Sequence, residues 1–166
     1  MSDISKEIEA LGPKPGFSGA QYNLVATRSE LEGVVLLNSQ FVLNMEHLPK
    51  RDEWKLSYGR KMKSCHFSAE QSSAAAVFEF HMTAKVGRAI ALRCVAHYAV
   101  FYETPEGATE EAARGFCRNV GVFAAYPYYR GLVARLVTEA GVNLPPLPAI
   151  ASTAHIPPKK QEVGAQ

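Results

Sequence analysis

The chain has 166 residues, of which 47% are hydrophobic and 20% charged, a balance typical of one globular domain. Its formal charge of +2 is too small to indicate a nucleic-acid partner, which usually requires a concentrated basic face. The first residues do not resemble a secretory leader, and no run approaches the roughly 18 apolar residues of a membrane span. We therefore expect a soluble, cytoplasmic protein that neither binds nucleic acid nor inserts into a membrane.

The composition changes at both ends of the chain. A cluster that breaks regular structure, Gly12-Pro13-Lys14-Pro15-Gly16, lies near the start. Near the end, paired prolines occur among polar residues without any period. We predict a flexible N-terminal arm over 1–20, an α+β domain over 21–150 and a disordered tail over 151–166.

Four segments alternate between apolar and polar residues, which is the period of a strand with one buried face. They span 35–45, 54–63, 78–86 and 90–102, and in the first the apolar residues occupy odd positions. Gly87-Arg88 predicts a tight hairpin turn between the last two. The fourth segment is also partly apolar on its second face, at Val95, Ala99 and Phe101. This indicates that a subunit, another layer or a ligand covers that face, and we favour a subunit.

Helical signals follow a break at 104–107. Thr109 is a suitable N-cap, and Glu110 and Glu111 would lie in the first turn, where negative charge is favourable. Apolar residues then recur at helical spacing until Gly141, the predicted end, while Pro127 either kinks this helix or begins a new one. The order predicts an α+β fold: a four-stranded antiparallel sheet with one long, interrupted helix packed on it. One helical layer leaves apolar area uncovered, which favours oligomerisation.

The sequence carries no recognisable catalytic or metal-binding motif. It has no glycine-rich phosphate loop, no His-Glu-x-x-His and no Cys-x-x-Cys. Cys65, Cys94 and Cys117 are odd in number and widely spaced, so we expect reduced core residues rather than disulfides. We therefore expect no enzymatic activity, no metal site and no cofactor.

One stretch of the chain resembles the signature of the SecB family of export chaperones. It comprises Tyr126-Pro127-Tyr128-Tyr129-Arg130, the helical run to Val137, and then Gly141-Val142-Asn143-Leu144-Pro145-Pro146-Leu147. In that family an aromatic-Pro-aromatic-x-Arg start leads a helix, which a glycine turn and a Pro-x-Leu run follow. The residues that match this pattern are Tyr126, Pro127, Tyr128, Arg130, Gly141 and Pro146.

The resemblance implies a SecB-like fold that assembles as a homotetramer, a dimer of dimers with the helices between two extended sheets. It also implies a molecular chaperone (holdase) without cofactor, which holds unfolded polypeptide in grooves and passes export precursors to the SecA motor for translocation. In this reading Pro127 sets the entry of the helix.

Two departures from the family pattern argue against contact with SecA. This chain is mildly basic, whereas export members are usually acidic, and it lacks the acidic-aromatic element after the Pro-x-Leu run. A SecB-like chaperone of an antitoxin, or a general holdase, is therefore one alternative. The alternative of another class is a small-ligand-binding protein or enzyme on an α+β scaffold, with its pocket on the second sheet face.

The resemblance also suggests which residues bind peptide, because in the family the second strand and the post-helix segment border the groove. The candidates are Trp54, Leu56, Tyr58, Leu144, Leu147 and Ile150. The competing interpretation is that they belong to the core or to a subunit interface, and for Leu56 and Leu147 we favour the core.

Overall fold

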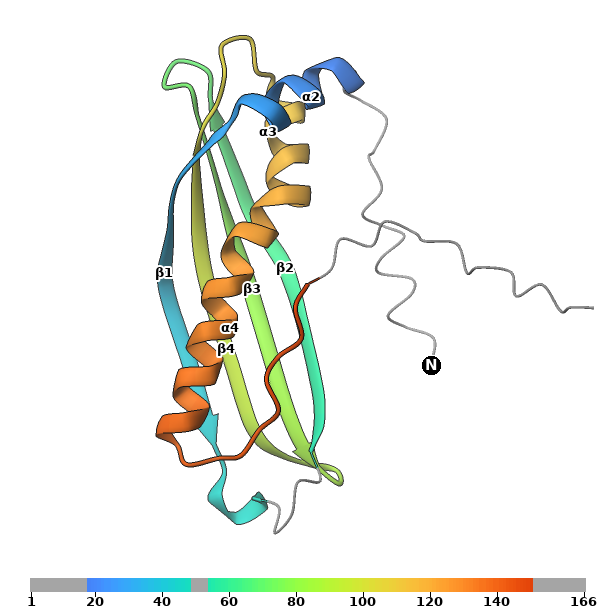
Figure 1. Cartoon of the computed structure of the whole chain (residues 1–166), viewed down its shortest axis with the longest axis vertical. Helices are drawn as coiled ribbons and strands as arrows, with labels where there is room; N and C mark the ends of the chain where they lie inside the picture. The colour runs from blue at the N-terminus through green and yellow to red at the C-terminus, as the bar shows by residue number, and fades with distance from the viewer. Residues whose placement is uncertain (1–17, 49–53, 151–166) are drawn as a thin grey trace, which may run out of the picture.

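The structure, a computed structural model, describes residues 18–48 and 54–150. In chain order the elements are α2 (Gly19–Arg28), β1 (Glu30–Leu43), a 3-10 turn (Met45–His47), β2 (Lys55–Ser68), β3 (Ser73–Val86), β4 (Ala89–Glu103), α3 (Glu110–Phe116), a π-helical segment (Cys117–Gly121) and α4 (Val122–Glu139). The strands form one antiparallel sheet in the order β1-β4-β3-β2, and the long helix crosses one of its faces (Figure 1). The predicted fold class is confirmed.

The four predicted strands and the hairpin at Gly87 are also confirmed, but the single apolar face predicted for β1 is wrong. The register shifts between Leu36 and Asn38, so that one extra residue bulges from the strand. Beyond the bulge Phe41 pairs with Cys94 on the helix-covered face, whereas Val35 before it lies on the opposite face, opposite Ala99. One inserted residue therefore reverses which face the odd positions occupy.

The long helix is interrupted as predicted, but the interruption does not lie at Pro127. Thr109 caps its start as predicted, and the break is the π-helical segment Cys117–Gly121. At Gly121 a Cβ atom would lie 3.0 Å from the Phe78 ring, so glycine allows the helix to approach the sheet closely. Pro127 is the sixth residue of α4 and is exposed, so the expectation that it begins a helix is wrong.

An aromatic cluster holds α4 on the sheet. The Phe80 ring of β3 stacks on Tyr129 with 5.2 Å between ring centroids, and it lies 5.9 Å from Tyr126. The Tyr129 hydroxyl donates a hydrogen bond of 3.0 Å to the carbonyl oxygen of Cys94 in β4. Phe80 and Tyr129 are both almost completely buried. The helix is thereby fixed to the two central strands through large apolar contacts and one buried hydrogen bond.

Helix α2 was not predicted. Its N-cap is Ser18, its fully buried Val25 joins the core, and the helix packs beside α3. Gly19 and Ala20, its first two residues, fall within the segment predicted as an arm. Residues 1–17 of that arm, and the tail predicted for 151–166, lie outside the described residues.

All three cysteines are free thiols, and two of them are core residues, as predicted. Cys94 and Cys117 are fully buried, whereas Cys65 of β2 is half-buried. A hydrogen bond from the Cys117 thiol lowers the pKa of Cys65, and the same contact raises the pKa of Cys117. The contact joins β2 to the π-helical segment.

Replacing the tyrosine that links α4 to β4 tests this packing. Tyr129→Phe keeps the aromatic ring and removes only the hydroxyl that donates to the Cys94 carbonyl. We expect it to lower the free energy of unfolding by about 1–2 kcal/mol. The matched control is Tyr128→Phe, because Tyr128 is 55% exposed and its change should stay within about 0.5 kcal/mol. Urea unfolding of both variants gives the comparison. Equal effects would show that this hydrogen bond does not anchor the helix.

Candidate functional site

The candidate site forms where the chain turns back after α4. Gly141 has a φ of +65°, and its N–H bonds to the Thr138 carbonyl at 3.0 Å. The next N–H, of Val142, bonds to the Val137 carbonyl at 3.1 Å, which completes a Schellman motif. The predicted end of the helix at Gly141 is confirmed. From there residues 142–150, called the return segment below, run in extended form on the helix side of the sheet (Figure 1).

Two hydrogen bonds and one buried side chain hold the return segment. The Trp54 indole Nε1–H donates to the carbonyl oxygen of Asn143 at 2.9 Å. The Tyr126 hydroxyl donates to the carbonyl oxygen of Pro148 at 2.7 Å. Leu147, only 2% exposed, inserts into the core between these points. Prolines prevent the segment from forming a helix, so its carbonyl groups accept bonds from side chains instead.

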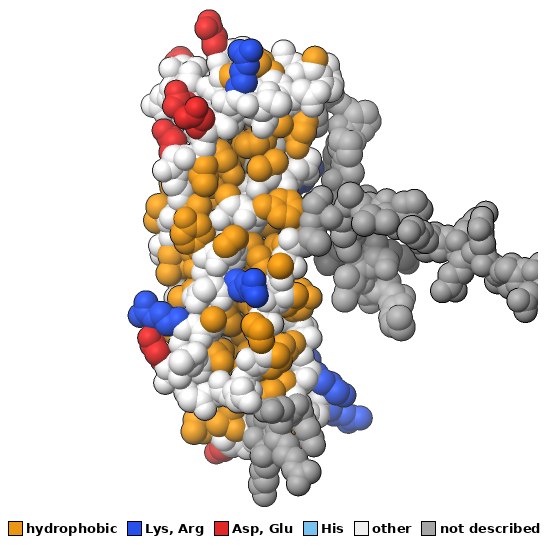
Figure 2. All heavy atoms as spheres, viewed as in Figure 1, with side chains coloured by type: hydrophobic (Ala, Val, Ile, Leu, Met, Phe, Trp, Pro, Cys, Tyr) orange, Lys and Arg blue, Asp and Glu red, His pale blue; other side chains and the backbone are white. Residues whose placement is uncertain are grey.

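A groove of about 620 Å³ lies between α4 and the return segment. Its lining is mainly apolar: Phe123 and Pro127 lie on the helix side, and Leu144 and Ile150 on the side of the return segment. Figure 2 shows hydrophobic side chains over most of this face of the molecule, whereas acidic side chains gather mainly toward its upper end. An apolar concave surface of this kind is suited to binding apolar side chains of another molecule.

The structure brings only part of the predicted site together. Residues from both predicted sets line the groove: Leu144, Leu147 and Ile150 among the peptide-binding candidates, and Tyr126, Pro127, Arg130 and Pro146 among the motif residues. Tyr128 is exposed beside it.

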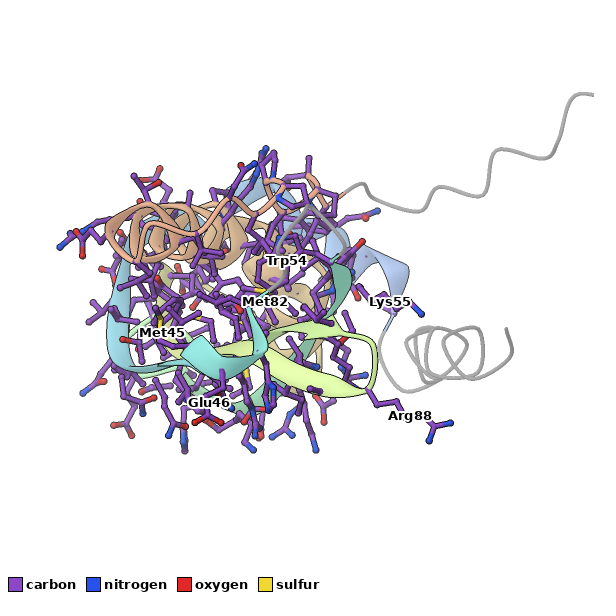
Figure 3. The ribbon with its side chains drawn as sticks, turned by 90° about the horizontal axis from the view of Figure 1, so that it is seen from below. Met45, Glu46, Trp54, Lys55, Met82 and Arg88 are labelled. Carbon is purple, nitrogen blue, oxygen red and sulfur yellow. The ribbon has the colours of Figure 1, made fainter. Side chains whose placement is uncertain are left out.

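The three candidates from the second strand do not line the groove. Trp54, the residue immediately before β2, lies on the helix side of the sheet, where it binds the return segment (Figure 3). Leu56 is half-buried and packs against the core. Tyr58 is 53% exposed and lies opposite Met82, on the helix-covered side of the edge strand β2.

Sequence reasoning missed Phe123 and Arg60. Phe123 was counted in the apolar stripe of the helix, yet it is 36% exposed and lines the groove. Arg60 lies opposite Phe80 on β2, and its guanidinium carbon is 5.9 Å from the Phe123 ring centroid. One signal was available, because Phe123, Pro127 and Arg130 recur at i, i+4 and i+7 on one helix face.

A second apolar surface follows β1, an edge strand of the sheet. Five of its aliphatic side chains are 42–52% exposed: Leu31, Val35, Leu36, Leu37 and Val42. Leu36 lies on the helix side, opposite Tyr98, and Val35 on the other side. The edge strand therefore presents apolar side chains on both faces, beside backbone groups that lack a neighbouring strand within the described residues.

The sheet face without helices carries a polar cluster around His97. Its ring nitrogens lie 2.8 Å from Asn38 Oδ1 and 3.2 Å from Glu79 Oε2, and Lys63 Nζ lies 3.4 Å from the same carboxylate oxygen. Although desolvation acts to raise it, Lys63 and His97 hold the pKa of Glu79 below its ordinary value. These groups satisfy one another and have no nucleophile among them.

Within residues 18–48 and 54–150, no three His, Cys, Asp or Glu side chains converge as metal ligands would. None of the helices in these ranges has the length and hydropathy needed to cross a bilayer.

The indole hydrogen bond that positions the return segment is open to test. Trp54→Phe keeps an aromatic ring but removes the donor to the Asn143 carbonyl. We expect amide hydrogens of residues 142–150 to exchange faster, with a loss of about 1 kcal/mol in local stability. Tyr128→Phe, at a tyrosine of α4 that is 55% exposed, is the control and should leave that exchange unchanged. Unchanged exchange in Trp54→Phe would show that other contacts position the segment.

Comparison with solved structures finds neighbours that share this fold, and one of them has a described ligand. That neighbour is a solved SecB-like chaperone from Mycobacterium tuberculosis, in complex with a ChAD peptide from the HigA1 antitoxin. The two chains agree with a TM-score of 0.70 and 17% sequence identity over 80% of this chain and 98% of that one. No family model matches the sequence, and no curated protein matches it. The agreement with that structure in fold, joined to the motif from Tyr126 to Leu147, establishes that this chain has the SecB-like fold.

Proposed function

We propose that this protein is a non-enzymatic molecular chaperone that holds unfolded polypeptide. The groove between α4 and the return segment is the observation that carries the proposal. Unfolded clients share little except exposed apolar side chains, and the groove offers Phe123, Pro127 and Leu144 to such side chains. Its wall is an extended segment rather than a closed shell, a shape that suits a chain passing through rather than one enclosed small molecule.

The alternative function, a small-ligand-binding protein or enzyme, would require a pocket on the second face of the sheet. The groove lies on the helix face instead. On the second face the described side chains include the mutually paired His97 and Glu79 beside Val95 and Phe101. This distribution favours binding of polypeptide on the helix side.

Two classes of client are compatible with this fold, namely an antitoxin and export precursors. The structural neighbour is described in complex with a peptide from an antitoxin, which supports a client of that class. The formal charge of +2 supports the same class, or a general holdase, over delivery of export precursors to SecA, which acidic surface would favour. We therefore favour a chaperone that acts in the cytoplasm without docking on SecA, with export as the alternative.

We further propose that the protein works as a homotetramer, a dimer of dimers. The argument rests on the exposed aliphatic side chains of β1, namely Leu31, Val35, Leu36, Leu37 and Val42. A second copy placed against the β1 edge would bury this apolar surface and pair the free strand edge. Multi-angle light scattering should give a mass near four times 18.1 kDa.

A pair of phenylalanine variants tests the holdase proposal. Phe123→Ser removes an apolar side chain from the groove, and Phe101→Ser removes one of similar exposure from the opposite sheet face. Loss of about 1 kcal/mol of apolar contact corresponds to about fivefold weaker client binding. We therefore expect Phe123→Ser to need about fivefold more protein to suppress aggregation of an unfolded model protein, whereas Phe101→Ser should match the parent.

Light scattering of the aggregating client gives the readout, and the mass of each variant is measured alongside it. If only Phe101→Ser loses activity at unchanged mass, clients bind the open sheet face and the groove assignment is wrong. If the parent protein does not suppress aggregation at all, the holdase proposal is wrong.

A further inference from the structure

The charges beside the groove all have one sign. Arg130 is the charged side chain among the described residues that line it, and its lining holds no carboxylate. The second charge is Arg60 of β2, whose guanidinium group lies over the ring of Phe123. Helix α4 carries its acidic residue, Glu139, at its far end, where Arg135 Nε pairs with it at 2.9 Å.

Both groove arginines are available to a bound molecule. The ion pairs within residues 18–48 and 54–150 involve Lys63, His97, Arg114 and Arg135, and neither Arg60 nor Arg130 takes part in one. Both side chains are exposed. Burial raises the pKa of Tyr126, and both arginines oppose that rise, which places their charges near the hydroxyl that holds the return segment.

An arginine at the edge of an apolar groove favours one kind of occupant. Guanidinium groups bind carboxylates through two parallel hydrogen bonds, and such charge-assisted bonds are stronger than neutral ones. The apolar lining lowers the local dielectric, so attraction to a bound carboxylate is greater than it would be in open water. A bound lysine would instead face two uncompensated positive charges. The local charge therefore selects among clients although the whole chain is only mildly basic.

We propose that the groove prefers extended apolar segments that carry an Asp or Glu, whose carboxylate pairs with Arg130 or Arg60. The inference rests on the proposed function, because it assumes that polypeptide enters this groove. It adds a rule for which clients bind best: apolar side chains occupy the lining, and an acidic side chain contacts the arginine pair.

Three fluorescein-labelled peptides test the rule. They share one extended apolar sequence and differ at a central position, which is Glu, Gln or Lys. We expect the Glu peptide to bind the full-length protein about fivefold more tightly than the Gln peptide, and the Lys peptide to bind more weakly than either, as read by fluorescence anisotropy. High salt should reduce these differences but leave binding of the Gln peptide almost unchanged.

Variants assign the effect to the two arginines. In the double variant Arg60→Gln with Arg130→Gln the Glu and Gln peptides should bind equally, and retained binding of the Gln peptide shows that the variant is folded. Arg93→Gln is the matched control, because Arg93 is exposed on the open face of β4, opposite Val42 of β1. It should keep the preference for Glu.

The outcomes separate the two proposals. Equal binding of all three peptides by the parent protein would overturn the acidic preference and leave the holdase proposal standing. A preference for Glu that survives in the double variant would overturn the assignment to Arg60 and Arg130. If none of the peptides binds the parent protein, the proposed function itself fails, and this inference fails with it.

Discussion

The contact between Phe80 and the tyrosines of α4 is the constraint on which the rest of the architecture depends. Phe80 lies at the centre of β3 and meets Tyr126 and Tyr129 on one side of the helix. Because these two tyrosines are turned toward the sheet, Pro127 and Arg130 lie on the adjacent flank of α4, which lines the groove. The same Tyr126 then supplies the hydroxyl that holds the return segment. One aromatic contact thus fixes both walls of the groove.

The fold leaves more apolar surface exposed than a single copy of the chain can cover. The long helix crosses the sheet diagonally, so the β1 edge keeps Leu31 and Leu36 uncovered on the helix side (Figure 1). Val35 before the bulge and Val42 beyond it both lie on the other face, which spreads the exposed apolar surface over both sides of the same edge. Such a surface suits contact with further copies, while the groove on the other side of α4 stays open to a client.

Alternation and turn residues predicted the four strands, the hairpin at Gly87 and the helix end at Gly141, since each depends on local residue preferences. Features set by packing escaped prediction. The β1 bulge and the π-helical segment leave no trace in residue periodicity, and Pro127 lies within α4 rather than at its start. For the site, the return segment was predicted from its motif, whereas Arg60 lies beside the groove-lining Phe123 only through contacts between distant segments.

Hydrogen–deuterium exchange with and without a bound unfolded client tests the central claim most directly, namely that polypeptide binds between α4 and the return segment. The account predicts slower exchange in residues 142–150 and in the part of α4 around Phe123, with little change in the strand segment around His97. Protection confined to β3 and β4 on the open face of the sheet, with the return segment unaffected, would contradict it.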